Sequence, residues 1–294
     1  GQISYPVSIT LTSSHFVEGG SSPSGGYYIV NGTNVGTSWA GFITSYQTNS
    51  IETVPPPNYV FYQWSDGVFQ NPRQISLTSA LTLYAVHKAH LGTGVEWGLS
   101  SNGQRKIYVE TNGTYHAVYE SMGSIWYTKS TDGGLTWLKE LWVGTGSSPA
   151  ITVQELYHNP IVAYQRITGS GTNVAMVSIY YPICSNWIYT GFLASSNANF
   201  DASPNICMLP ESQGIDSPTF LTFVKEINGE KIAQFYTPYA NSPNVSVNWD
   251  ARRISTASYN YNVWIAMEGS NISPYRSDIA TRTYDAIYGS WSYP

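Results

Sequence analysis

The most constraining part of the sequence is an eight-residue segment, Ser-Thr-Asp-Gly-Gly-Leu-Thr-Trp, at positions 130–137. An Asp side chain in a turn accepts hydrogen bonds from the backbone amides that follow it, and glycine permits positive φ angles. Asp132, followed by Gly133 and Gly134, therefore predicts a tight hairpin turn. Trp137 is placed to fold back over that turn as an apolar cover. The segment fixes a bend between two strands and supplies no chemistry of its own.

The same segment fits a known motif at every defining position. It resembles the Asp box, S-x-D-x-G-x-T-W, which occurs on the blades of sialidase-like β-propellers. The matching residues are Ser130, Asp132, Gly134, Thr136 and Trp137. The resemblance implies an antiparallel blade around this turn, and it points to an architecture more than to an activity.

The sequence around the motif repeats on the scale of a propeller blade. Four strands in about forty residues is the repeat length of a propeller, and residues 104–143 fit it. The strands expected there are 106–110, 114–120, 124–130 and 137–143, followed by 150–153, 160–166, 174–181 and 187–193 in a second blade. A third blade is expected within 218–253 and a fourth from Asn262 onward. A catalytic sialidase propeller has six blades, so a small propeller, an incomplete one and an open stack of sheets all remain possible interpretations.

The N-terminal third has a different texture. Residues 59–86 contain Trp-Ser-Asp-Gly at 64–67, preceded by Phe61 and followed by Arg73 and two short strand patterns. This stretch resembles the divergent InlB-type B-repeat module, a small β domain of bacterial and archaeal surface proteins that has no catalytic role. The glycine- and serine-rich tract 19–26 is expected to be a flexible loop.

These patterns together predict the fold class and the domain organisation. We expect an all-β protein in which a small N-terminal β module, residues 1–88, precedes an Asp-box β-propeller or partial propeller of about four antiparallel blades, residues 92–294. Residues 87–94 are the expected connection. Helical periodicity is absent throughout.

Composition excludes several classes of partner. Charged residues make up 11% of the 294 residues and the formal net charge is −5, without the basic stripe that nucleic acid binding needs. No apolar run is long enough to span a bilayer. A surface poor in charge and rich in hydroxyl and amide groups is typical of secreted proteins that meet carbohydrate or pack against copies of themselves. The chain begins at Gly1 in a strand-like pattern, and we therefore expect a mature, extracellular or cell-surface protein.

Two features are typical of an exported protein. The only two cysteines, Cys184 and Cys207, are expected to form a disulfide, with two buried free thiols as the alternative. Asn-x-Ser/Thr sequons make glycosylation candidates of Asn31, Asn112, Asn244 and Asn271.

Candidate catalytic residues are sparse. The sialidase resemblance implies three arginines that grip a carboxylate, a Tyr nucleophile activated by a Glu, and an Asp acid/base. The family's F/Y-R-I-P signature is missing, because residues 104–107 read Gln-Arg-Lys-Ile, and this departure argues against sialidase activity. Glu110, Glu120 and Glu155 lie at expected strand ends, where they are either paired acid/base carboxylates or solvated termini; we favour the second interpretation. Histidine spacing predicts no metal site, and no cofactor motif occurs.

The N-terminal residues alternate with the period of a half-buried strand. Apolar residues occupy every second position, namely Ile3, Tyr5, Val7, Ile9 and Leu11. Such a segment can add to the open sheet edge of a neighbouring copy and link copies into a filament, or it can be the first strand of its own domain.

The sequence therefore predicts a secreted, non-enzymatic cell-surface protein with a structural or adhesive role, able to assemble into extracellular filaments through its first strand. The expected partners are copies of itself or cell-surface carbohydrate. The alternative is a carbohydrate-binding protein or sialidase-like glycoside hydrolase, in which exposed Tyr and Trp side chains form platforms for sugar rings.

Overall fold

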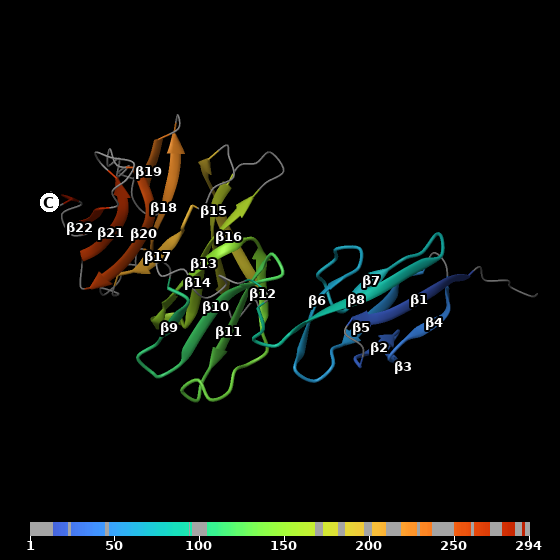
Figure 1. Ribbon diagram of the computed structural model, residues 1–294. Helices are drawn as coiled ribbons and strands as arrows, with labels where there is room; N and C mark the ends of the chain where they lie inside the picture. The colour runs from blue at the N-terminus through green and yellow to red at the C-terminus, as the bar shows by residue number, and fades with distance from the viewer. Residues whose placement is uncertain are drawn as a thin grey trace, which may run out of the picture. The chain divides into compact units, whose positions relative to one another are not determined.

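The computed structural model gives the arrangement of most of the chain (Figure 1). The described residues are 14–22, 25–44, 47–93, 95, 105–167, 173–181, 186–196, 202–209, 219–227, 230–236, 250–259, 262–270, 278–285 and 290–291. Apart from one short 3-10 helix, η1 (Glu155–Tyr157), every regular element among them is a strand. The all-β prediction is confirmed. The chain divides into two compact units, Gly1–Gly92 and Thr93–Pro294.

The first unit consists of two four-stranded sheets, with strand orders β4-β1-β8-β6 and β3-β2-β5-β7. Their strands are β1 (Ser14–Ser22), β2 (Tyr27–Val30), β3 (Thr33–Gly36), β4 (Trp39–Thr44), β5 (Asn49–Val54), β6 (Tyr59–Trp64), β7 (Arg73–Ile75) and β8 (Leu81–Ala89). Strand β1 pairs in parallel with β8 and antiparallel with β4. Trp64, which is fully buried, lies in a shared core with residues such as Tyr28, Ile51 and Leu83.

Two local expectations for the first unit are wrong. The tract expected as a loop at 19–26 belongs to β1 as far as Ser22, because the ladder to β8, and at Gly19 also the ladder to β4, holds it extended. The connection expected to begin at His87 is still strand, since β8 continues to Ala89 and His87 is buried. The expected assembly strand, Ile3 to Leu11, lies outside the described residues.

The Trp-Ser-Asp-Gly turn of the first unit is held by its own side chains. The amide of Gly67 donates to the carbonyl of Trp64 at 2.8 Å, and both oxygens of Asp66 lie 2.8 Å from an Arg73 nitrogen. The Arg73 guanidinium also lies over the Trp64 ring, 5.9 Å from its centroid. These are the residues on which the B-repeat resemblance rests, and they form one cluster; the module assignment itself stays a prediction.

The second unit consists of antiparallel sheets that follow one another along the chain. Four are described, and they are called the first to the fourth sheet below. In that order their strand orders are β12-β11-β10-β9, β13-β14-β15-β16, β17-β18-β19 and β20-β21-β22-β23. Their strands are β9 (Ile107–Val109), β10 (Tyr115–Ser121), β11 (Ser124–Ser130), β12 (Leu141–Thr145), β13 (Ser147–Gln154), β14 (Asn159–Ile167), β15 (Asn173–Tyr181), β16 (Asn186–Ser196), β17 (Asn205–Met208), β18 (Thr219–Ile227), β19 (Glu230–Tyr236), β20 (Asp250–Tyr259), β21 (Asn262–Ser270), β22 (Asp278–Asp285) and β23 (Ser290–Trp291). Figure 1 shows them in succession from the green β9 to the red β22.

Each neighbouring pair of sheets shares a hydrophobic core. Val162 and Tyr164 of β14 pack with the first sheet, whereas Ile161 and Ala163 of the same strand pack with the third sheet. Alternate residues of a strand point to opposite faces, so β14 is buried on both sides. A further core joins the third and fourth sheets around Phe220 and Ile265. The sheets therefore pack in series, as the blades of a propeller or partial propeller do.

The boundary between the third and fourth sheets differs from the expectation. The third blade was expected within 218–253, but residues 250–253 begin β20, which pairs with β21 from Asp250↔Ser270 to Tyr259↔Asn262 with one register shift between Ala251 and Arg253. The third sheet instead begins with β17, which pairs with β18. The short β17 carries little periodicity of its own, and tertiary packing decides its assignment.

Candidate functional site

The Asp132 turn is closed by side-chain hydrogen bonds between β11 and β12. The Asp132 carboxylate accepts from Thr136, through its amide at 2.9 Å and its hydroxyl at 2.5 Å, and from the Ser130 hydroxyl at 2.7 Å. These donors, those of Thr136 first, lower the pKa of Asp132 to about 2. Both glycines that follow have positive φ, and a Cβ on Gly134 would lie 4.0 Å from the Trp137 ring. The geometry is that of a structural turn, and the Asp-box identification stays a prediction.

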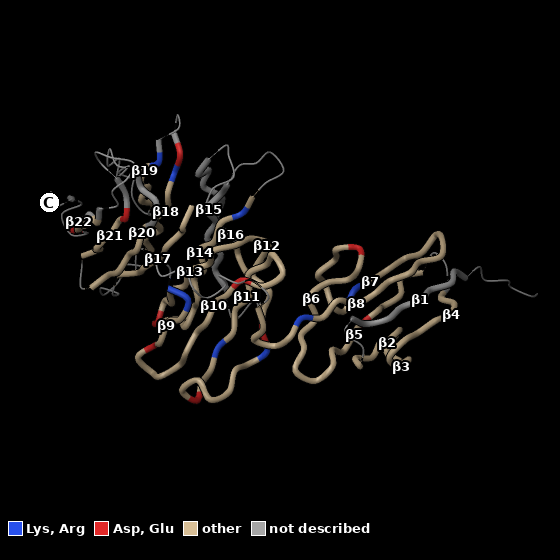
Figure 2. Tube along the Cα trace, viewed as in Figure 1, with Lys and Arg blue, Asp and Glu red and all other residues tan. Residues whose placement is uncertain are grey.

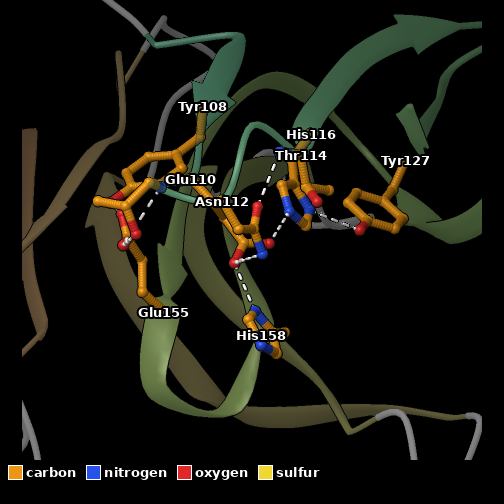
Figure 3. A network of polar contacts seen from close by, with 9 residues as sticks. Tyr108, Glu110, Asn112, Thr114, His116, Tyr127, Glu155 and His158 are labelled. Atoms are coloured by element: carbon orange, nitrogen blue, oxygen red, sulfur yellow. Dashed lines mark hydrogen bonds and ion pairs between the residues drawn. The ribbon is translucent and has the colours of Figure 1, made fainter. Parts of the chain in front are cut away.

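A buried carboxylate, that of Glu110, forms the centre of a second polar cluster (Figure 3). Glu110 follows β9 and is only 4% exposed. Its Oε1 lies 2.5 Å from Nε2 of His116 in β10, and its Oε2 lies 2.5 Å from Nδ1 of His158, which follows η1. Asn112 Nδ2 donates to the same carboxylate at 3.3 Å. Because a carboxylate can only accept, both imidazole nitrogens carry a proton toward it.

His116 continues this cluster into the core between the first two sheets. Its Nδ1 lies 2.8 Å from the hydroxyl of Tyr127, whose ring in turn meets the Trp187 ring edge-on at 5.5 Å. Burial lowers the pKa of His116, although the carboxylate of Glu110 acts in the opposite direction. A neutral imidazole fits these contacts, because Nε2–H donates to Glu110 while Nδ1 accepts from Tyr127.

Glu155 makes a parallel set of contacts from η1 back to the first sheet. Its carboxylate accepts from the hydroxyls of Tyr108 and Thr111, both at 2.8 Å. Burial disfavours the charge, but these hydrogen bonds outweigh it and lower the pKa of Glu155. Burial, followed by the hydrogen bond to Glu155, raises the pKa of the Tyr108 phenol. The Arg105 guanidinium lies over the Tyr108 ring, 5.7 Å from its centroid.

All three carboxylates proposed from the sequence bridge the same pair of sheets. Glu120, on β10, accepts from the backbone amide of Ser148 on β13 at 3.1 Å. Glu110 contacts His158 in the connection between β13 and β14. Glu155 contacts Tyr108 in β9 and Thr111 in the turn that follows β9. The preferred interpretation as solvated strand termini is therefore wrong for Glu110, which is buried and fully engaged. Their common feature is attachment of one sheet to the next.

Sequence reasoning missed the partners of these carboxylates. His158 has a left-handed backbone, φ 53°, at the end of η1, and Tyr127 lies within a strand buried along nearly its whole length. For His158, the one local signal in the sequence is its position directly after a short turn that begins with an acidic residue. The pairing itself depends on how two sheets stack and has no signature in sequence spacing.

Two arginines whose side chains are described lie apart from this cluster. Arg73 pairs with Asp66 in the first unit, and Arg166 is exposed at the end of β14. Within the described residues no group of three or more His, Cys, Asp or Glu side chains is arranged to hold a metal ion. Figure 2 shows scattered blue positions and, over the described part of the chain, no continuous basic stripe. None of the helices described is long and apolar enough to cross a membrane.

The predicted disulfide is not formed in this structure. Cys207 is a free thiol, buried in the core between the third and fourth sheets, and Cys184 lies outside the described residues. Burial raises the pKa of the Cys207 thiol to about 12, so this sulfur is an inert, apolar core group.

Two of the four glycosylation candidates lie in exposed hairpin turns. Asn31 links β2 to β3 with φ 48°, and its amide contacts Asn49 and Ser50. Asn112 caps the β9–β10 turn by accepting from the amide of Thr114 at 2.8 Å. Asn244 and Asn271 lie outside the described residues. Modification at any of these positions stays a prediction.

The fold and these contacts define an all-β protein in which carboxylates join successive sheets. No protein-family model and no curated protein sequence matches the chain. Among solved structures it is similar to the NanB sialidase of Streptococcus pneumoniae, with a TM-score of 0.41 and 13% identity over 75% of this chain and 40% of that one. It is also similar to the catalytic domain of the Coprinopsis cinerea GH62 α-L-arabinofuranosidase, with a TM-score of 0.37 and 16% identity over 66% and 70%. A hypothetical protein from Leishmania major gives 0.38 and 11% over 66% and 68%. Similarity at this level carries no functional argument.

Proposed function

We propose that the protein is a secreted, non-enzymatic cell-surface protein with a structural or adhesive role. The observation that supports the non-enzymatic part of this proposal is the engagement of the Glu110 and Glu155 carboxylates at the junction of the first two sheets. Glu110 accepts from two imidazoles and Glu155 from two hydroxyls, so the oxygens that a glycosidase would direct at its substrate are bonded to protein groups. In an acid/base mechanism at least one of the two carboxyl groups must contact the sugar.

Self-assembly through the N-terminal segment is the specific structural role that we propose. Among the described strands, β4 pairs only with β1, so its other edge has no described partner strand. Natural sheet edges are protected from strand addition by charges or proline, and β4 reads Trp-Ala-Gly-Phe-Ile-Thr with neither. Phe42 on this strand is 70% exposed. An unprotected edge of this kind suits the alternating segment from Ile3 to Leu11 of a second copy.

The assembly proposal is tested by negative-stain imaging of the purified full chain, of a chain lacking residues 1–12, and of Phe42→Lys. We expect filaments from the full chain and single particles from both variants, because a lysine on the edge opposes strand addition. Tyr84→Lys places the same charge on β8, an interior strand of the same sheet, and should leave assembly intact. Filaments from the truncated chain would exclude this mechanism.

The competing enzymatic function, a sialidase-like glycoside hydrolase, is tested separately with fluorogenic sialosides and other aryl glycosides. We expect no turnover above that of heat-denatured protein. Turnover that disappears in Glu155→Gln, without a change in melting temperature, would show that this carboxylate acts on substrate and would overturn the non-enzymatic proposal. Carbohydrate binding without hydrolysis is a second candidate function, and one surface of the fourth sheet favours it.

A further inference from the structure

The fourth sheet buries one face and exposes the other. Ile254, Val263 and Ile265 point into the core shared with the third sheet. The alternating positions point outward: Tyr259 is 69% exposed and Trp264 is 40% exposed. Since side chains of a strand alternate between its two faces, these aromatic residues lie on one outward surface.

The strand register places the two aromatic residues next to each other. Trp264 on β21 is directly opposite Ala257 on β20, and Tyr259 is two residues beyond Ala257 on the same strand. Such diagonal neighbours have Cβ atoms about 7 Å apart, within reach of aromatic side chains. Tyr259 and Trp264 therefore form a pair of rings on adjacent strands.

Tyr259 and Trp264 each belong to a row of side chains that runs across the strands, and polar side chains occupy the neighbouring positions in both rows. Asn262 is opposite Tyr259 and also opposite Asp285 of β22, while Thr283 is opposite Trp264. All three are partly exposed. The aromatic pair is thus flanked by an amide, a carboxylate and a hydroxyl, which between them donate and accept hydrogen bonds.

The surface beside the rings is made of small side chains. Ala257 stands in the same row as Trp264 and Thr283, and the next row holds Ser255 and Thr281; all three of these small side chains are exposed. Ile279, two positions before Thr281 on β22, is the one large exposed aliphatic side chain described on this face. A protein partner would need a larger apolar centre than this, whereas two rings above a floor of small side chains suit a flat ligand.

We propose that this surface, made of Tyr259, Asn262, Trp264, Thr283 and Asp285, binds a neutral carbohydrate chain. A pyranose ring carries C–H groups on its faces and hydroxyls around its rim, so the faces stack on aromatic rings and the rim hydrogen-bonds to neighbouring polar groups. Two adjacent rings can contact successive residues of one chain. The carboxylate of Asp285 beside them disfavours an anionic sugar, and sialosides are therefore not the expected ligand.

This inference makes the carbohydrate-binding candidate specific and does not depend on filament assembly. The surface lies on the fourth sheet, away in the fold from the carboxylates of the first and second sheets. It needs no hydrolysis, because its chemistry is stacking and hydrogen bonding alone.

The test is isothermal titration calorimetry of the full chain with cellohexaose, xylohexaose and mannohexaose, and separately with sialyllactose. At least one neutral hexasaccharide should bind at millimolar concentration or below, and sialyllactose should bind more weakly than it. Trp264→Ala and Tyr259→Ala should each weaken binding about tenfold, and Trp264→Phe should lose less. Ile279→Ala, on the same face but away from the rings, should bind like the unmodified chain.

Each of the following results would overturn the inference: no binding of any neutral hexasaccharide, unchanged binding in both aromatic variants, or tighter binding of sialyllactose. If Trp264→Ala changed the oligomeric state measured by sedimentation but not sugar binding, the surface would be a protein interface, and the inference would likewise be overturned. Because all these side chains are partly exposed, the melting temperature of each variant verifies folding. The variants leave residues 1–12 and β4 intact, so failure here is distinguishable from failure of the assembly proposal.

Discussion

The Oε2 atom of Glu110 lies 2.5 Å from Nδ1 of His158, a residue 48 positions away in the connection between β13 and β14 of the next sheet. The carboxylate is buried, whereas the imidazole is 62% exposed. The contact therefore fastens a surface connection to the interior of the preceding sheet. Burying a carboxylate is costly unless it is fully hydrogen-bonded, and Glu110 meets that condition with two imidazoles and an amide.

Glu110→Gln should destabilise the protein by about 2 to 3 kcal/mol, because an amide nitrogen would face one of the two imidazole N–H groups. Urea unfolding monitored by tryptophan fluorescence measures this difference. Glu155→Gln is the matched control in a less buried position and should cost less. Equal stabilities of the two variants and the unmodified chain would contradict a structural role for Glu110.

The stability of the first unit should fall in mild acid because of His87. Its Nε2 lies 3.2 Å from the Thr53 hydroxyl, its Nδ1 has no hydrogen-bond partner, and burial lowers its pKa to about 4. The unfolded chain, with an ordinary histidine pKa near 6.5, binds more protons between these two values. Stability is therefore lost as the pH falls from about 6.5 toward 4, by roughly 3 kcal/mol at most.

Urea unfolding at several pH values between 7.5 and 4 measures this loss. His87→Gln retains a donor for Thr53 but cannot titrate, so its stability should depend less on pH. An unchanged slope in that variant would contradict the role given to His87 and assign the acid sensitivity to other groups.

Asp132→Ala should lower the melting temperature by a few degrees, because Thr136 and Ser130 lose their acceptor. The pKa of Asp132 in the folded protein, about 2, lies below the ordinary value of 3.8. The stabilisation is therefore complete above about pH 4 and is lost as the pH falls through 2. Asp132→Asn keeps the shape of the side chain without its charge. The difference in melting temperature between this variant and the unmodified chain should therefore disappear as the pH falls from about 4 to 2. A gap that stays constant down to pH 2 would show that the charge contributes nothing.

Gly146→Ala should be among the most damaging small substitutions. A Cβ at this position, between β12 and β13, would lie 2.3 Å from the backbone oxygen of Gln165 and 2.6 Å from the Tyr164 ring. Relief requires a backbone shift, and we expect a loss of about 3 kcal/mol or more. Gly113→Ala is the control, since Gly113 has φ +86° and open space around it, and should cost about 1 kcal/mol. Chemical denaturation of both variants decides the comparison; similar losses would contradict the assigned packing.

The strands of the second sheet could be predicted closely because their alternation is strong and their turns carry clear signals. The expected strand 160–166 is β14, Asn159–Ile167, and the expected strand 174–181 is β15, Asn173–Tyr181. The short turn after Ser130 was also foreseeable, since Asp132 and the two glycines after it act over only a few residues.

What escaped prediction depends on contacts between distant segments. Gly19 and Gly20 of β1 are extended because β8 pairs with both of them and β4 pairs with Gly19, although glycine itself has a low strand propensity. Glu110 reads as a strand-end residue until the second sheet brings His158 against it. The outward face of β20 and β21 likewise becomes visible only when the register of both strands is known.

The central claim is that carboxylates join the first sheet to the second, and a double-mutant cycle between Glu110 and His158 tests it most directly. The free energy of unfolding is measured for Glu110→Gln, His158→Ala, the double variant and the unmodified chain. A structural bridge predicts a coupling energy of about 1 to 2 kcal/mol. Coupling indistinguishable from zero, with strictly additive losses, would contradict the bridge.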